Sequence, residues 1–316
     1  TTTLRTSSAA SDVYKRQPMC GIVGLFLKDA SLEPKLGELL SAMMITMSDR
    51  GPDSAGIALY GNKQPNLLKL TLQSPTPDQD FDGLDHLVSE RTGSEVTMER
   101  RDTHGVLFVT SELLLEVRRA LGDLRPSIRL MSTGESIEIY KEVGHPAGVV
   151  NRFQLEKMTG THGIGHTRMA TESIVNTLGA HPFSTGIDQC LVHNGSLSNH
   201  NSLRRRLIRE GVHFETENDS EVAAAYLTHR MSSGATLTQA LESGLQDLDG
   251  FYTFVIGTRD GFGVMRDPIA CKPAVMAETD RYVAFGSEYR ALVNLPGVDG
   301  ARIWEPEPAT PYFWVH

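Results

Sequence analysis

Four positions in the chain combine a reactive side chain with a place at the edge of an apolar segment. Cys20 directly precedes a strand-like run, and Arg168 ends the glycine-rich run "GIGHTR". Asn194 is followed by Gly195 in "LVHNGSLSN", and Asp219 stands before a helical pattern. A thiolate is a strong nucleophile, and a guanidinium can clamp a carboxylate. An amide beside a backbone N–H can stabilise an oxyanion, and a carboxylate can hold a substrate ammonium.

Cys20 needs a base, because an isolated thiol has a pKa of about 8.5 and is mostly protonated at neutral pH. If Met19 is removed, the cysteine carries its own base as a free α-amino group. With a pKa of about 7.7 to 8.0, that amine is roughly a quarter to a third neutral near pH 7.5. Removal of Met19 is expected because the residue that follows it is small. Cys20 is therefore a candidate nucleophile only in a chain that has been processed before it.

Each of these residues, taken alone, also fits a structural role. Cys20 in an apolar run fits a buried structural cysteine, and Arg168 fits a surface ion pair. Asn194 and Gly195 form a dipeptide that commonly turns a β-hairpin, and Asp219 fits a helix N-cap. No single motif decides between the structural and the chemical interpretation.

The elements that must position these residues form a mixed pattern. Short strands are expected at 21–27 and 56–60 and, near the end of the chain, in "FYTFVIGTRD", "GFGVMRD" and "YVAFGSE". Helices are expected at 36–44, 149–158, 220–231 and 236–245. Many short strands with helices gathered between them favour antiparallel sheets covered by helices over a βαβ alternation.

A separate block follows a polar and turn-rich connection at 61–104. In this block we expect a strand, a helix with Ser111 as its N-cap, and a hairpin that turns at Thr133 and Gly134. We assign the block with its flanks to a small α/β insertion at roughly 85–150.

In their order along the chain, the motifs resemble the glutamine amidotransferase domain of class II, a branch of the N-terminal-nucleophile hydrolases. The similar segments are "CGIVG" from residue 20, "RGPDSAG" from 50, "HTRMAT" from 166, "AHPF" from 180, "HNG" from 193 and "DSE" from 219. The resemblance covers residues 20–290 apart from the insertion. It implies an α+β fold: a four-layer αββα sandwich of two antiparallel sheets covered by helices, with a small α/β insertion.

The resemblance also implies a role for each candidate residue. Cys20 is then the nucleophile, with its α-amine as general base and acid, and Asn194 and Gly195 form the oxyanion hole. The residues expected to bind substrate are Arg168 and Thr171 at the glutamine α-carboxylate, Asp219 at the α-ammonium and, in a supporting role, Arg50. The reaction would run through a glutamyl thioester, which releases ammonia first and glutamate on hydrolysis.

The chain is expected to act beside a separate synthase subunit that accepts the ammonia, since only about 26 residues follow residue 290. The insertion and "SIEIYKEVGHP" resemble stand-alone amidotransferase subunits of glutamate-synthase-like complexes, above all that of N-methylglutamate synthase. The partner in such complexes carries flavin and iron–sulfur groups, so we expect no cofactor and no metal in this chain. The expected substrate is glutamine or, in an amine-exchange equivalent, glutamate. A non-catalytic assembly subunit and a free-standing hydrolase of other amides stay open as alternatives.

Composition narrows the function further. The 316 residues carry a net charge of −9, and no apolar run is long enough to cross a bilayer. The acidic balance argues against nucleic acid as the main ligand, and the basic cluster at Arg204 is expected to form a solvated helix face. Three widely spaced cysteines fit a reducing compartment, so we expect a cytoplasmic protein.

Residues 1–18 are rich in serine and threonine and lack the apolar core of a secretory signal. They fit a transit peptide, a cleaved propeptide or a foreign tail translated from adaptor sequence, and we favour the last. The expected organisation is a non-native tail or cleaved propeptide at 1–19, followed by one amidotransferase domain at 20–316.

Overall fold

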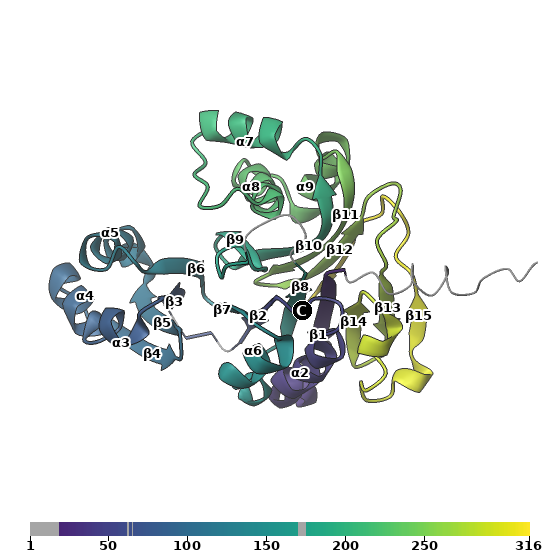
Figure 1. The fold of residues 1–316 in the computed structure, drawn as a ribbon, viewed down its shortest axis with the longest axis horizontal. Coiled ribbons are helices and arrows are strands. Elements are labelled where there is room, and N and C mark those ends of the chain that lie inside the picture. Colours follow the sequence, from purple (N-terminus) through teal and green to yellow (C-terminus); the bar gives the residue numbers. More distant parts are fainter. Residues whose placement is uncertain (1–18, 62, 65, 170–174) are drawn as a thin grey trace, which may run out of the picture.

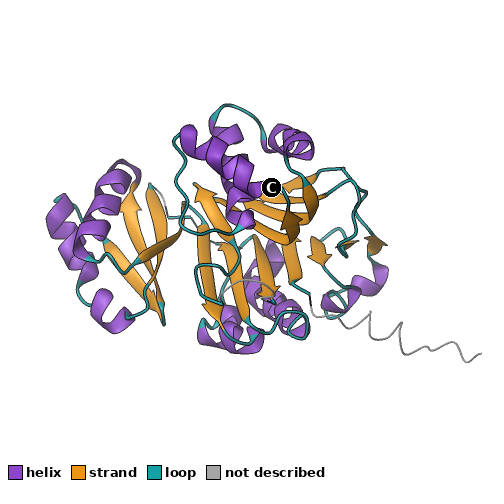
Figure 2. Cartoon of the chain, turned by 45° about the horizontal axis from the view of Figure 1, so that its top comes forward, coloured by secondary structure: helices purple, strands orange, loops and turns teal. Residues whose placement is uncertain are grey.

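The structure is a computed structural model that describes residues 19–61, 63–64, 66–169 and 175–316. Two large antiparallel sheets lie against each other, and helices cover the outer face of each (Figure 1). A third, smaller sheet with its own helices stands to one side (Figure 2). The expected α+β fold with αββα layers and a small insertion is therefore confirmed. None of the described helices is both long and apolar enough to cross a membrane.

The first large sheet has seven strands in the order β15-β13-β14-β1-β8-β2-β7. They are β1 (Gly21–Leu27), β2 (Ser54–Tyr60), β7 (Ile137–Val143), β8 (His162–Arg168), β13 (Val275–Glu278), β14 (Tyr282–Gly286) and β15 (Arg302–Trp304). Helices α2 (Leu36–Thr46) and α6 (Pro146–Arg152) lie on its outer face (Figure 1). Strands β1 and β2 are buried along their whole length, because helices cover one face and the second sheet covers the other.

The second large sheet has five strands in the order β16-β12-β11-β10-β9. They are β9 (Phe183–Gly186), β10 (Gln189–Leu197), β11 (Gly250–Thr258), β12 (Gly261–Arg266) and β16 (Tyr312–Val315). Its outer face is covered by α7 (His200–Arg209), α8 (Asp219–Ser232) and α9 (Leu237–Asp247) (Figure 1). Between the two sheets, Ile22 and Phe26 of β1 belong to one apolar cluster with Val192 of β10 and Phe262 of β12. This inner core fixes the distance between the facing sheets.

The insertion is built on a four-stranded sheet in the order β4-β5-β3-β6. Its elements are β3 (Leu67–Gln73), β4 (Thr97–Arg101), β5 (His104–Thr110), β6 (Arg129–Gly134), α3 (Pro77–Asp80), α4 (Leu84–Thr92) and α5 (Leu114–Leu124). The expected polar connection at 61–104 is wrong, because β3 is a largely buried inner strand of this sheet. The sheet and its helices span 67–134, which differs from the expected insertion at 85–150.

Short 3-10 turns join several of these elements. They are η1 (Ala30–Lys35), η2 (Ser111–Leu113), η3 (Leu155–Lys157), η4 (Tyr289–Ala291) and η5 (Val298–Gly300). Ser111 does not cap α5 as expected, because it opens the turn η2, which precedes that helix.

The hairpin expected at Thr133 and Gly134 is also wrong. Strand β6 pairs with β3 in the small sheet, whereas β7 pairs with β2 in the seven-stranded sheet. The chain therefore leaves the insertion at this point and enters the core instead of turning back on itself.

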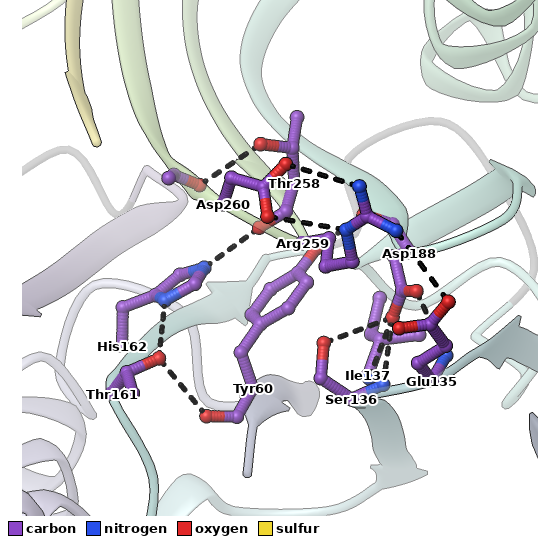
Figure 3. A network of polar contacts seen from close by, with 11 residues as sticks. Tyr60, Glu135, Ser136, Ile137, Thr161, His162, Asp188, Thr258, Arg259 and Asp260 are labelled. Atoms are coloured by element: carbon purple, nitrogen blue, oxygen red, sulfur yellow. Dashed lines mark hydrogen bonds and ion pairs between the residues drawn. The ribbon is translucent and has the colours of Figure 1, made fainter. Parts of the chain in front are cut away.

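Asp188 fixes the place where the chain changes sheets. Its carboxylate accepts hydrogen bonds from the backbone N–H groups of Glu135 (2.8 Å), Ser136 (2.9 Å) and Ile137 (3.0 Å). Figure 3 shows this carboxylate beside the three residues of the junction. Asp188 itself lies between β9 and β10 of the five-stranded sheet. Its side chain therefore connects that sheet to residues 135–137, where the chain passes from the insertion sheet to the seven-stranded sheet.

Candidate active site

Cys20 directly precedes β1 in the seven-stranded sheet. Because β1 and β8 are antiparallel, the start of β1 lies beside the end of β8. Gly21 pairs with Thr167 of β8, so Cys20 stands beside Arg168, one step beyond the last pair. The Cys20 thiol lies 3.8 Å from the carbonyl oxygen of Met169, a residue 149 positions later in the chain. The strand order thus brings two of the expected site residues together.

The main-chain carbonyl of Cys20 is held from two sides. Arg50 Nε donates to it at 3.2 Å, and Asn194 Nδ2 donates to it at 3.1 Å across the gap between the two sheets. Because an amide nitrogen carries two hydrogens, Asn194 keeps a second donor for another acceptor. Arg50 is buried and forms an ion pair with Glu288, which also pairs with Arg290 at 2.6 Å.

A close approach of backbone positions the loop that carries Arg50. A side chain on Gly51 would overlap the carbonyl of Thr167 and lie 2.5 Å from the backbone nitrogen of Arg168. Beside it, the N–H of Asp53 donates to the carbonyl of Arg168 at 3.1 Å. Glycine at position 51 therefore allows the backbone of the loop to pack directly against the end of β8. Arg168 itself is 7% exposed, so it is a buried residue and does not lie on the surface.

Asn194 and Gly195 do not turn a hairpin. Both lie within β10, which pairs with β11 over its whole length, and Gly195 stands opposite Tyr252. Gly195 has a φ of +147°, in the region that favours glycine, and an added Cβ would overlap the carbonyl of Phe251. The Asn-Gly pair is therefore a fixed feature of the strand, with an amide and a backbone N–H next to each other.

Asp219 is the first residue of α8, and the helix N-cap is Asn218, whose side chain accepts from the backbone N–H of Ser220. The Asp219 carboxylate instead accepts from the backbone N–H of Leu197 in β10 at 2.9 Å. Its side chain is 21% exposed, so an oxygen can still reach a bound cation.

The expectation that Arg204 lies on a solvated helix face is wrong. Arg204 is buried and donates to the carbonyls of Thr216 (2.5 Å) and Asn218 (3.2 Å).

Burial and nearby charges have opposite effects on the pKa of the Cys20 thiol. Burial raises the pKa of the Cys20 thiol, whereas the cations Arg168, Arg50 and Lys272 lower it. Sequence reasoning missed Lys272, although it lies in the segment "MRDPIACKP". Arg266 Nη2 donates to the carbonyl of Lys272 at 2.8 Å and holds this part of the loop after β12. Burial outweighs the three cations, so the pKa of the thiol stays above its ordinary value and Cys20 needs a base to release its proton.

Thr171, expected at the substrate carboxylate, lies outside the described residues. Within the part of the chain that the structure describes, no three His, Cys, Asp or Glu side chains are grouped so that they could hold a metal ion. The structure therefore brings Cys20, Arg50, Arg168 and Asn194 to one place and sets Asp219 against the same strand as Asn194.

Comparisons with known proteins agree with this arrangement. The sequence pattern of the family described as "Glutamine amidotransferase domain" matches residues 166–294. The "Glutamine amidotransferase-like protein GlxB" of Rhizobium meliloti (strain 1021) is 65% identical over 298 residues, which cover 94% of this chain and 99% of that protein. This chain belongs to the glutamine amidotransferase family. The resemblance to class II amidotransferases of the N-terminal-nucleophile type is confirmed, and so is the expectation that the chain is an enzyme of this class.

Two further proteins illustrate the breadth of the glutamine amidotransferase family. The "Putative glutamine amidotransferase" of Methanothermobacter thermautotrophicus is 34% identical over 290 residues, which cover 87% of this chain and 93% of that protein. The glutamine phosphoribosylpyrophosphate amidotransferase of B. subtilis has the same fold, with a TM-score of 0.59 at 20% identity. That match covers 93% of this chain and 47% of the B. subtilis chain.

Proposed function

We propose that this amidotransferase is a glutaminase-type subunit in which Cys20 attacks the side-chain amide of glutamine. The observation that carries the proposal is the convergence on Cys20 of Arg50, Asn194 and Arg168, which come from three distant segments. A structural cysteine at a strand end needs no such surroundings.

The proposed reaction begins after the peptide bond before Cys20 has been removed. The free α-amine of Cys20 takes the thiol proton, and the sulfur attacks the amide carbon of glutamine. The second N–H of Asn194 and the backbone N–H of Gly195 then stabilise the oxyanion. The amine returns the proton to the leaving nitrogen, the C–N bond breaks, and ammonia departs from a glutamyl thioester. Water attacks the thioester, glutamate leaves, and the thiol is restored.

The head of the substrate is matched by two opposite charges. Arg168, with help from Thr171, binds the α-carboxylate of glutamine, and Asp219 binds the α-ammonium. The contact of Asp219 with the backbone of Leu197 supports this assignment, because it fixes the carboxylate on the strand that also carries Asn194. An amide substrate that lacks the α-carboxylate or the α-ammonium would lose the contact with Arg168 or with Asp219.

The ammonia is proposed to pass to a separate synthase subunit of the glutamate-synthase type, with N-methylglutamate synthase as the leading case. That partner would hold the flavin and iron–sulfur groups, since hydrolysis of an amide by a thiol requires neither. All three cysteines of this chain are free thiols, which supports a reducing compartment such as the cytoplasm.

The proposal is tested by acid quenching of the reaction with glutamine and mass spectrometry of the protein. We expect a glutamyl adduct on Cys20, steady release of ammonia, and loss of both in the Cys20→Ala variant. Cys271→Ser is a matched control, because Cys271 is exposed. A Cys20→Ala variant that releases ammonia as fast as the wild type would show that the chain is not a Cys20-dependent glutaminase.

A further inference from the structure

A buried hydroxyl links two histidines to the carboxylate of Asp219. Ser220 Oγ lies 2.8 Å from His181 Nε2 and 2.9 Å from His193 Nδ1. The same hydroxyl donates to Asp219 Oδ1 at 3.3 Å. Ser220, His181 and His193 are each buried, so water does not substitute for these contacts.

The three contacts use the hydroxyl of Ser220 completely. A hydroxyl has one hydrogen to donate and two lone pairs to accept with, and a carboxylate can only accept. All three hydrogen bonds exist at once when Ser220 donates to Asp219 and both histidine nitrogens donate to Ser220. Burial lowers the pKa of both His181 and His193, which keeps the rings neutral in this arrangement.

Members of this network are next to site residues in the chain. His193 immediately precedes Asn194 on β10, and Ser220 immediately follows Asp219 on α8. The ring of His181 stacks on that of His166, with a centroid distance of 4.1 Å, and His166 lies two residues before the end of β8. The hydroxyl of Ser220 therefore joins the strand of the proposed oxyanion hole to the helix that carries the proposed ammonium ligand.

The Asp219 carboxylate is held at both of its oxygens. Oδ2 accepts from the backbone N–H of Leu197, whereas Oδ1 accepts from Ser220 and lies 3.8 Å from His193 Nδ1. Without the hydroxyl, Oδ1 would keep only the longer contact with His193, and the carboxylate could rotate away from one orientation. The backbone contact of Oδ2 does not restrict that rotation by itself.

We infer that Ser220 is a positioning residue that orients the Asp219 carboxylate relative to Asn194 and thereby sets the preference for substrates with an α-ammonium. This inference rests on the proposed function. In the proposed mechanism Ser220 touches no substrate atom and acts only through Asp219.

The test compares hydrolysis of glutamine with that of glutaramate, which has the same amide and carboxylate but no α-amino group. The ratio of the two kcat/KM values measures the contribution of the ammonium. In Ser220→Ala we expect this ratio to fall about tenfold, because an oriented charged hydrogen bond is lost. A variant that merely loosens the fold would slow both substrates alike and leave the ratio unchanged. Ser220→Thr keeps the hydroxyl and should retain the wild-type ratio.

Ser41→Ala is the matched control, because Ser41 is a buried helical serine on α2, on the outer face of the other sheet. It should keep the wild-type ratio. Ser220→Cys, which differs by one atom and donates weakly, replaces Ser220→Ala if the alanine variant does not fold. Asp219→Ala is the reference variant and should lose the preference for glutamine over glutaramate. If it does, a Ser220→Ala or Ser220→Cys protein with the wild-type ratio would overturn the inference. If the wild type itself does not prefer glutamine over glutaramate, the proposed function fails instead.

Discussion

Replacing Gly195 by alanine should damage both the strand pairing and the proposed oxyanion hole. The added Cβ would lie 2.8 Å from the carbonyl carbon of Phe251 and 2.9 Å from His193 Nε2, where ordinary contacts begin at 3.4 Å. It would also force alanine to adopt a φ of +147°. Strain of this kind costs about 1–3 kcal/mol, and overpacking adds about 1–3 kcal/mol, so we expect a loss of about 2–6 kcal/mol in the free energy of unfolding.

The same change should reduce catalysis more than stability alone explains. Relief of the overlap has to move β10 away from β11, and this displaces the amide of Asn194 from its 3.1 Å contact with the Cys20 carbonyl. Loss of one oxyanion donor lowers kcat by about 10²–10³. The assays are urea unfolding and steady-state glutaminase kinetics, with Gly122→Ala in α5 as control, because a Cβ there meets nothing within 4 Å. A Gly195→Ala protein that matches Gly122→Ala in both assays would show that neither the strand pairing nor catalysis depends on glycine at position 195.

Three further predictions concern the junction of the sheets, the nucleophile and acid stability. Asp188→Asn should lower the free energy of unfolding by about 2–4 kcal/mol, because the NH₂ group of asparagine would face backbone N–H groups that now donate to the carboxylate. An unchanged urea midpoint would show that the Asp188 carboxylate does not stabilise the junction. Lys272→Met should slow alkylation of the processed Cys20 thiol by iodoacetamide at neutral pH relative to Lys272→Arg, because removal of the cation raises the thiol pKa. Both variants are measured in a Cys271→Ser background, since Cys271 is exposed. Equal alkylation rates would show that Lys272 does not lower the pKa of Cys20. Burial lowers the pKa of three histidines to about 3, namely His104, His162 and His166. Below pH of about 6.5 the unfolded chain therefore binds more protons than the folded one, and stability falls by up to about 2 kcal/mol per histidine at pH 5; equal urea midpoints at pH 7.5 and 5 would disprove it.

The sequence was sufficient to predict the layers because the central strands are local signals, and its motifs mark residues that lie close to Cys20 in the structure. The run after Cys20 is a strand as expected and is buried along its whole length, and the segments that end in Arg168 and contain Asn194 are also strands. Arg50, expected in a supporting role, donates a hydrogen bond to the carbonyl of Cys20. The functional roles assigned to these residues remain predictions for the assays above.

The features that the sequence did not reveal depend on partners far along the chain. The turn signal at Thr133 and Gly134 is locally correct for a hairpin, but Asp188, more than fifty residues later, fixes a crossing between sheets. Strand β3 alternates apolar and polar residues in a segment that is otherwise polar, and only its place inside the small sheet buries it. Ser220 gives no sign of its contacts with His181 and His193, which lie 39 and 27 residues away in the chain.

In the proposed mechanism, activity requires a free α-amine on Cys20. This requirement is tested by replacing residues 1–19 with a leader that a specific protease removes immediately before Cys20. Glutaminase activity is then measured on the same preparation before and after cleavage, with the intact mass confirming the new N-terminus. We predict negligible ammonia release from the uncleaved chain and full activity once Cys20 is the first residue. Equal ammonia release before and after cleavage would show that the reaction does not need the α-amine of Cys20.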